Sequence, residues 1–179
     1  MATNLRPFRD YDEHDVINLF AVAGTADKGL VVMADASAGW KNTDELNNLG
    51  AVGASYANTV SDRFGSNATV KAASGASAAP IGMLLHDVKE TDENGEKLIF
   101  NPRKAAEMGV SLSGQATPVV TRGIFLYSGS TLKTETVTAG LDLYHDDNGE
   151  IVTGTTNTKI GKALGGVDSN NHVLVKLEL

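Results

Sequence analysis

Short apolar runs separated by turn-forming residues recur along most of the chain. From Pro80 onward they follow one another at roughly 8–12 residues, the spacing typical of a β-sandwich or β-barrel. The pattern predicts strands at 81–88, 97–100, 119–127, 141–144, 151–152, 160–167 and 173–179, with a weak alternation at 134–139. We therefore expect a mainly β fold.

Two apolar runs in the first half, 16–22 and 30–33, flank the small and polar stretch 24–29. This arrangement predicts a hairpin-like unit. Its hydrophobicity is continuous rather than alternating, which indicates burial on both faces or a closed, barrel-like core. A short helix is expected at 102–108, where Asn101 suits the N-cap and Pro102 suits the first helical position.

Two segments depart from the β pattern. Residues 1–14 are polar and Pro7 disfavours helix, so we expect an extended arm outside the core; a disordered terminus is the alternative. Residues 35–79 are rich in Ala, Gly, Ser and Asn and too long for an ordinary connection. They predict a loop-rich insertion with a short helix at 44–49 capped by Thr43. The remainder, 15–179, is expected to be a single β-rich domain.

One sequence pattern occurs twice. Ile, Gly, Leu and Val stand at the same four places in 81–88 and 160–167, and each copy precedes a polar turn and a strand-like run. Glycine inside a strand marks a bulge, a bend or a close backbone approach. Gly82 and Gly161 are therefore predicted corner positions in two halves of one β scaffold; a chance match is the alternative.

Asn-Gly pairs end two strand-like runs, at Gly95 and at Gly149. They predict tight hairpin turns in which glycine supplies a positive φ. The acidic residues before Gly149 resemble a calcium loop, but position 12 of that pattern falls on Thr155 instead of Glu. A weak surface cation at either turn is the alternative.

Composition narrows the function classes. The 179 residues contain no cysteine, which excludes disulfides and thiolate metal sites, and a net charge of −7 argues against a general nucleic-acid binder. The histidines are scattered, and no complete phosphate-loop or nucleophile-elbow motif occurs. We therefore expect no enzyme, metal site or cofactor. The sequence has no apolar run typical of a signal peptide and no stretch of ~20 apolar residues. We therefore expect neither secretion nor a membrane partner.

The order of five short motifs is distinctive. They are the apolar pair over 16–33, Ile-Gly-x-x-Leu at 81–85, Gly-Ile-Phe-Leu-Tyr at 123–127, Asp-Leu-Tyr with an Asp-Asn-Gly turn at 142–149, and the closing Ile-Gly-Lys-Ala-Leu and Val-Leu-Val-Lys-Leu runs. This order resembles the head decoration, or cement, proteins of tailed bacteriophages. The resemblance covers most of the chain outside 35–79 and implies a small β-barrel-like or β-tulip domain with short helices.

The resemblance also implies a function. It is that of a virion structural protein on the capsid exterior, assembled in the host cytoplasm, which bridges major capsid protein subunits, often as a homotrimer. An N-terminal arm would contact the capsid, with Arg6 and Arg9 pairing with carboxylates and Phe8 and Tyr11 filling pockets. The alternative is a carbohydrate- or receptor-binding β module on the virion surface, whose binding face would be formed by Trp40, Tyr56 and the turn residues.

Overall fold

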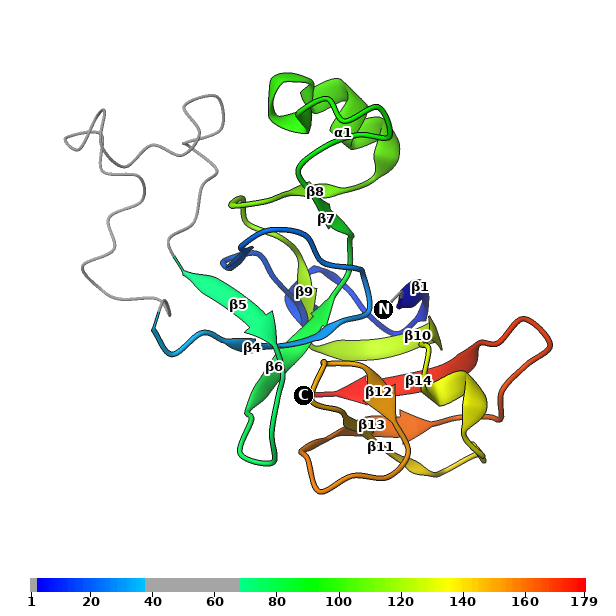
Figure 1. Cartoon of the computed structure of the whole chain (residues 1–179). Coiled ribbons are helices and arrows are strands. Elements are labelled where there is room, and N and C mark those ends of the chain that lie inside the picture. Colours follow the sequence, from blue (N-terminus) through cyan, green and yellow to red (C-terminus); the bar gives the residue numbers. More distant parts are fainter. Residues whose placement is uncertain (1–2, 38–67) are drawn as a thin grey trace.

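The computed structural model describes residues 3–37 and 68–179, which form two six-stranded sheets, a two-stranded sheet and one short α-helix (Figure 1). The curled, half-barrel arrangement confirms the predicted β-barrel-like class. Sheet A runs in the order β1 (Asn4–Arg9), β10 (Arg122–Ser128), β14 (Val173–Glu178), β13 (Lys159–Ala163), β11 (Asp142–His145), β12 (Ile151–Val152). Sheet B runs in the order β2 (Val16–Ile17), β9 (Val119–Val120), β6 (Pro80–Leu84), β4 (Val31–Ala34), β5 (Thr69–Ala72), β3 (Ala21–Val22).

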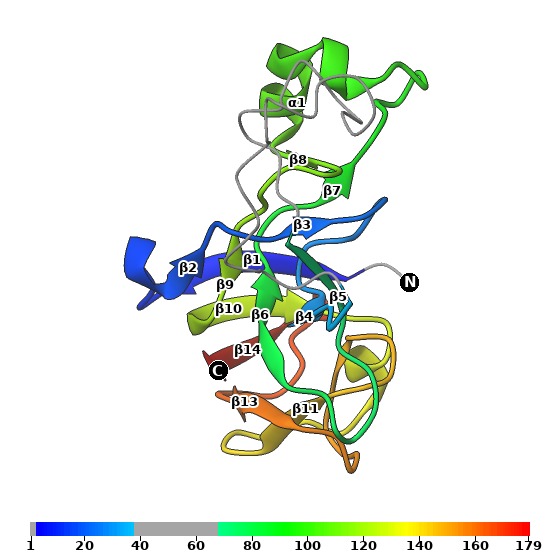
Figure 2. The ribbon, with the colours of Figure 1, turned by 90° about the vertical axis from the view of Figure 1, so that its left-hand side faces the viewer.

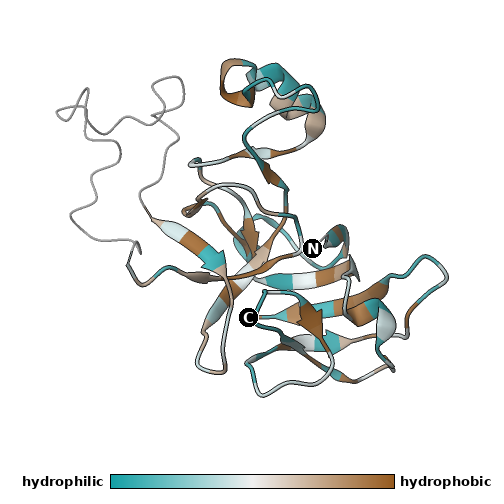
Figure 3. Cartoon of the chain, viewed as in Figure 1, coloured by the Kyte–Doolittle hydropathy of each residue, from teal (hydrophilic) through white to brown (hydrophobic). Residues whose placement is uncertain are grey.

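The two sheets share a main core, to which sheet A contributes Phe125 and Leu143 and sheet B contributes Met83. Sheet B has a second core on its other face, formed by Val22, Val32, Val70, Leu84, Val88 and Val119. The predicted burial on both faces is therefore confirmed for the run that contains β4. Sheet A differs, because β10 and β14 alternate between buried and more exposed residues, which is visible as alternating bands in Figure 3.

A third unit projects away from the large sheets (Figures 1 and 2). It contains β7 (Val88–Lys89), η4 (Leu98–Phe100), α1 (Pro102–Met108) and β8 (Ser111–Leu112). The predicted helix is confirmed at its stated bounds, with Asn101 accepting a hydrogen bond from the Lys104 N–H at 3.1 Å. The strand predicted at 97–100 was wrong, because these residues form a 3-10 turn that buries Leu98 against Ala105.

The repeated sequence corresponds to a repeated structure. In each copy the strand register shifts at the residue directly before the glycine, between β4 and β6 at Gly82 and between β11 and β13 at Gly161. A Cβ on Gly82 would lie 2.5 Å from the Val120 carbonyl oxygen, and one on Gly161 would overlap the carbonyl oxygen of Lys176. Both predicted features, a bulge and a close backbone approach, are therefore confirmed at both glycines.

Backbone hydrogen bonds show that the two copies are also equivalent outside the residues that match in sequence. The Gly29 N–H donates to the Leu84 carbonyl at 2.7 Å, and the Gly140 N–H donates to the Ala163 carbonyl at 2.8 Å. Both donor glycines have a positive φ, +87° and +86°. β4, β6 and β9 of sheet B thus correspond to β11, β13 and β14 of sheet A.

The correspondence also places the insertion. Asp35 donates its N–H to the Thr69 carbonyl at 3.0 Å, as Asp146 does to Glu150 at 2.8 Å. Residues 36–68 therefore occupy the position of the three turn residues 147–149. Because Thr69–Ala72 form β5, the loop predicted for 35–79 was wrong in this part. The helix predicted at 44–49 with its Thr43 cap, and Trp40 and Tyr56, lie outside the described residues.

Other predictions differ where pairing is non-local. The hairpin over 16–33 was wrong, since β2 pairs with β9 and β3 pairs in parallel with β5. The strand predicted at 119–127 breaks at Thr121, where the chain passes from sheet B to sheet A. The alternation at 134–139 gives no strand: η5 (Leu132–Thr134) precedes an irregular segment. The hairpin glycines are confirmed, with φ of +83° at Gly95 and +78° at Gly149.

Part of the segment predicted as an arm, Asn4–Arg9, is built into sheet A. β1 pairs antiparallel with β10, and Leu5 is buried in the main core. The backbone is extended as predicted, but its position outside the core was wrong for this strand. β1 lies at the edge of the sheet, so one of its two sides has no partner strand among the described residues.

Replacing Gly161 by Ala tests the close approach. Its new methyl group would overlap the β14 backbone, so we expect a loss of at least about 2 kcal/mol of unfolding free energy. This corresponds to a melting temperature lower by roughly 4–8 °C. Gly165→Ala is the matched control, because no atom lies within 4 Å of that position. Equal melting of the two variants would contradict the packing argument.

Replacing residues 36–68 by Asp-Asn-Gly, the residues at 147–149, tests the insertion. We expect a folded protein with a single cooperative thermal transition, because the flanking hydrogen bonds already match a tight hairpin. Circular dichroism and calorimetry measure this. A control that deletes 147–149 without replacement should lose the transition; loss in the transplant as well would refute the proposed equivalence.

Candidate functional site

The outer face of sheet A is formed by the alternate, more exposed residues of its strands. The strand pairing aligns many of its outward residues in two rows, next to the paired Arg122 and Glu178. The basic row consists of Arg9, Ile124, Lys176, Lys162 and Asp142. The apolar row consists of Arg6, Leu126, Leu174 and Leu164, the last joined by its N–H to the Leu174 carbonyl at 2.7 Å.

The equivalent positions of sheet B show why this face is unusual. Val31, Met83 and Val120 lie in the main core and are fully or almost fully buried. Their counterparts in sheet A are Asp142, Lys162 and Lys176. The same face of the repeated unit is therefore apolar and covered in one copy, and charged and open to water in the other. Because these three positions are charged, no further layer packs on this face of sheet A among the described residues.

Ion pairs organise the basic row. The ammonium groups of Lys159 and Lys162 lie 2.8 and 2.9 Å from one oxygen of Asp142. Hydrogen bonds from Lys159 and then Lys162 hold the pKa of Asp142 below its ordinary value, and the same pairing raises the pKa of Lys159. Two cations on one carboxylate leave this group with a net positive charge.

A second ion pair lies further along the same face, between Lys176 and Glu178. The hydrogen bond from the lysine lowers the pKa of the Glu178 carboxyl. Both side chains are about half exposed, so water and salt screen the pair and it contributes little to stability. The pair holds the Lys176 ammonium next to the Glu178 carboxylate on the outer face of the sheet.

Three of the four residues predicted to contact a partner lie at the edge of this face. Arg6, Phe8 and Arg9 are on β1 and are exposed. The register with β10 shifts between Pro7 and Arg9, which makes Phe8 the extra residue of a bulge and leaves it 52% exposed. The Arg9 guanidinium lies 5.6 Å from the centre of the Phe8 ring. The structure brings Phe8 and Arg9 together, with Arg6 on the same strand.

Tyr11, the fourth predicted contact residue, is used differently. Its ring packs on the buried ring of Phe125 at a centroid distance of 5.4 Å and an interplanar angle of 44°. A Cβ at Gly123 would lie 2.7 Å from the Tyr11 Cβ, so glycine is required for this approach. Tyr11 therefore anchors the end of β1 within its own chain, with part of its surface still exposed.

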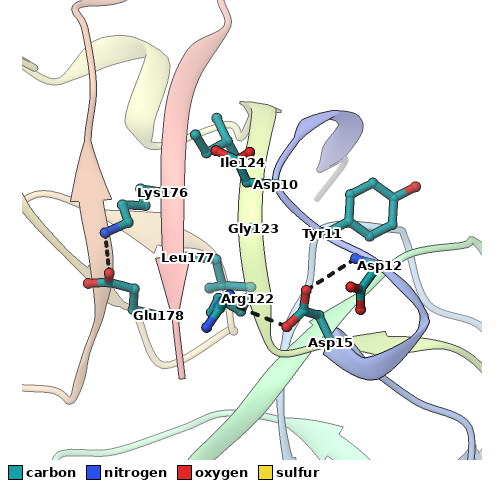
Figure 4. Close-up of a pocket in the computed structure, with 10 residues that line it drawn as sticks. All are labelled: Asp10, Tyr11, Asp12, Asp15, Arg122, Gly123, Ile124, Lys176, Leu177 and Glu178. Atoms are coloured by element: carbon teal, nitrogen blue, oxygen red, sulfur yellow. Dashed lines mark hydrogen bonds and ion pairs between the residues drawn. The ribbon is translucent and has the colours of Figure 1, made fainter.

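An open groove of about 540 Å³ separates Tyr11 from the basic row (Figure 4). Two of its carboxylates, Asp12 and Asp15, have partners within the chain. Asp12 accepts the His14 N–H at 2.8 Å, and Asp15 accepts the Asp12 N–H at 3.1 Å and pairs with Arg122 at 3.6 Å. These contacts stabilise the 3-10 turn η1 (Glu13–Asp15) and tie it to β10. The lining contains no nucleophile beside a base.

The buried polar side chains near the β11–β12 hairpin also have structural partners. Glu150 accepts hydrogen bonds from the Ser130 hydroxyl at 2.8 Å and from the Thr131 hydroxyl at 3.2 Å. The Tyr127 hydroxyl accepts the Ile151 N–H at 3.1 Å, and burial raises the pKa of this tyrosine. These contacts fasten the hairpin to β10 and the following turn, away from the outer face.

The basic and apolar rows were missed by the sequence reasoning, which looked for contact residues before residue 15. The signal was present as alternation in 122–128 and 173–178, where every second residue is outward. What could not be obtained from the sequence is the register that aligns Leu126 with Leu174 and Leu164.

Comparisons with known proteins add no relative: no family model matches the chain, and neither the curated proteins nor the solved structures contain a significant match. The resemblance to head decoration proteins therefore rests on the motifs themselves. Within 3–37 and 68–179, no helix has the length and apolar character needed to span a bilayer. The same residues contain no group of three His, Asp or Glu side chains placed to hold a metal ion.

Replacing Asp142 by Asn tests the charge arrangement of the basic row. Because its pKa is lowered in the folded state, Asp142 stabilises the fold above the unfolded-state pKa of about 3.9, and this contribution is lost as pH falls through the lower folded-state value. We expect the variant to melt below wild type at pH 7 in low salt.

The two proteins should converge at pH values well below 4 and also in 1 M salt, where the pairing is screened. Melting curves across pH and ionic strength provide the measurement. Glu107→Gln removes a more exposed carboxylate with a single cation partner, Arg103, and serves as the control with a smaller effect. A difference between D142N and wild type that is independent of pH and salt would rule out the ion-pair explanation.

Proposed function

We propose that this protein is a virion structural protein that binds the outer surface of an assembled capsid and stabilises the shell by bridging major capsid protein subunits. The observation that carries the proposal is the exposed corner formed by Arg6, Phe8 and Arg9 next to an open sheet face. The five motifs that resemble head decoration proteins support it independently of the geometry.

The exposed corner has the chemistry of an interface anchor. An aromatic ring with an arginine over it offers apolar area, a cation and several fixed hydrogen-bond donors within a small patch. Such residues are enriched among those that dominate binding energies. The bulge presents Phe8 outward on a strand that pairing holds in place, so little ordering is needed on binding.

Stabilisation of a shell follows from mass action. A protein that binds the assembled capsid and not its separated subunits favours the assembled form by RT ln(1 + [L]/Kd). If three copies associate, three contacts would bind with an avidity far above that of one. The carbohydrate-binding alternative depends on Trp40 and Tyr56, which the described residues do not include, so no observation favours it.

The triple variant Arg6→Ala, Phe8→Ala, Arg9→Ala tests the proposal. We expect its affinity for expanded, undecorated capsids of the parent virus to fall at least about tenfold, since aromatic and arginine anchors commonly dominate an interface. Co-sedimentation over a concentration series measures the affinity, and protection of the shell against heat measures the consequence.

Phe100→Ala is the matched control, because Phe100 is 74% exposed and lies on the projecting unit instead of β1. It should bind capsids as wild type does. The proposed function fails if wild-type protein does not bind capsids, and the proposed contact fails if the triple variant binds as tightly as wild type.

A further inference from the structure

The charges of the chain are segregated. The six strands of sheet A contain six Lys and Arg residues and two Asp and Glu residues, a net charge of +4. The whole chain has 15 basic and 22 acidic residues, so the remainder carries nine basic and twenty acidic residues, a net charge of −11. Adding Asp10, Asp12 and Asp15 of the adjacent groove still leaves sheet A at +1. The strands of sheet A and the rest of the sequence therefore carry net charges of opposite sign.

The positive charge stands on the outer face, because the strands send their apolar residues inward. Internal ion pairs remove only part of it. Asp142 is shared by Lys159 and Lys162, which leaves one positive charge in excess. Arg6 and Arg9 form no ion pair with any residue that the structure describes, and they border the two rows on the β1 side.

An apolar stripe lies beside the basic row. Leu126, Leu174 and Leu164 are aligned across three adjacent chain segments, and Leu164 is 40% exposed. An interface needs such a patch for affinity, while the surrounding charges determine orientation and partner choice. The combination is that of a protein-docking surface.

We propose that the outer face of sheet A docks on an acidic protein surface of the capsid shell that has an apolar patch beside its acidic residues. This inference rests on the proposed function and specifies the chemistry of its partner. The positive charges on the outer face would favour approach of sheet A to an acidic shell.

Two other occupants fit less well. A nucleic acid would be repelled by the acidic remainder, and Asp142 and Glu178 stand among the cations that a phosphate chain would have to follow. A second copy of the chain would place its acidic remainder against this face. Such a contact between copies is head-to-tail. In an open chain of copies, the terminal copy would still have an uncovered positive face.

The double variant Lys162→Glu, Lys176→Glu tests the docking surface. Lys97→Glu, Lys133→Glu is the matched control, because both lysines are exposed and lie outside sheet A, and the change in net charge is the same. We expect the first variant to bind undecorated capsids at least about tenfold more weakly than the control, mainly through a slower association rate. Thermal melting confirms that both are folded, and Lys162→Gln, Lys176→Gln should give an intermediate loss.

Salt and polymer probes separate the outcomes. The wild-type association rate should fall as salt rises, whereas the rate of the sheet A variant should not. Poly-L-glutamate should shift NMR signals of sheet A residues, and duplex DNA should shift them less at equal charge concentration. Equal capsid binding by the two double variants would overturn the inference. Stronger binding of DNA than of polyglutamate would also overturn it, as would self-association that only the sheet A variant abolishes.

The inference and the proposed function fail separately. Absence of capsid binding by wild-type protein removes the proposed function and, with it, the capsid as the acidic partner. Capsid binding that survives the sheet A charge reversal but is lost in the β1 triple variant keeps the function and removes the docking surface proposed here.

Discussion

The packing of two six-stranded sheets against one common core determines which surface remains for binding. Sheet B sends Val31, Met83 and Val120 into that core and needs a second core for its other face. Sheet A packs against the main core with its inward residues, and its other face contributes to no core among the described residues. Its outward positions are therefore free to carry charge, and Lys162 and Lys176 stand where the other copy has buried apolar side chains. The candidate binding surface is the unburied face of a repeated unit.

The two strand glycines make this packing possible. At Gly82 and Gly161 the neighbouring strand approaches where any larger residue would have its Cβ, while a register shift directly before each glycine adds local twist. The central strands β6 and β13 each have a close approach to one neighbouring strand and a bulge opposite the other. This combination lets both strands bend. Both sheets curl in this way, and the curled sheets enclose a core although only 6% of the residues are aromatic.

The accuracy of the sequence predictions followed the range of the interactions. The helix after Asn101 and the turns at Gly95 and Gly149 depend on neighbours within a few residues, and they were predicted correctly. The 16–33 hairpin was wrong because β3 pairs with β5 across the long insertion. A local apolar pattern specifies that a strand is buried, but the partner depends on the whole sheet. For the same reason the sequence indicated candidates that are close along one strand, Arg6, Phe8 and Arg9, and did not indicate the rows, which depend on the register of several strands.

The edge position of β1 favours contact through side chains over strand addition. An arm that contributes a strand to a partner needs free backbone groups, but β10 already pairs with β1. On the outer edge Pro7 lacks an N–H, the bulge at Phe8 interrupts the repeat, and Arg6 and Arg9 add charge, all features that discourage edge-to-edge pairing. The same features point the ring and the guanidinium groups outward. A partner would then meet β1 and the outer face of sheet A as one continuous side-chain surface, in which Phe8 supplies the apolar anchor and the rows supply orientation.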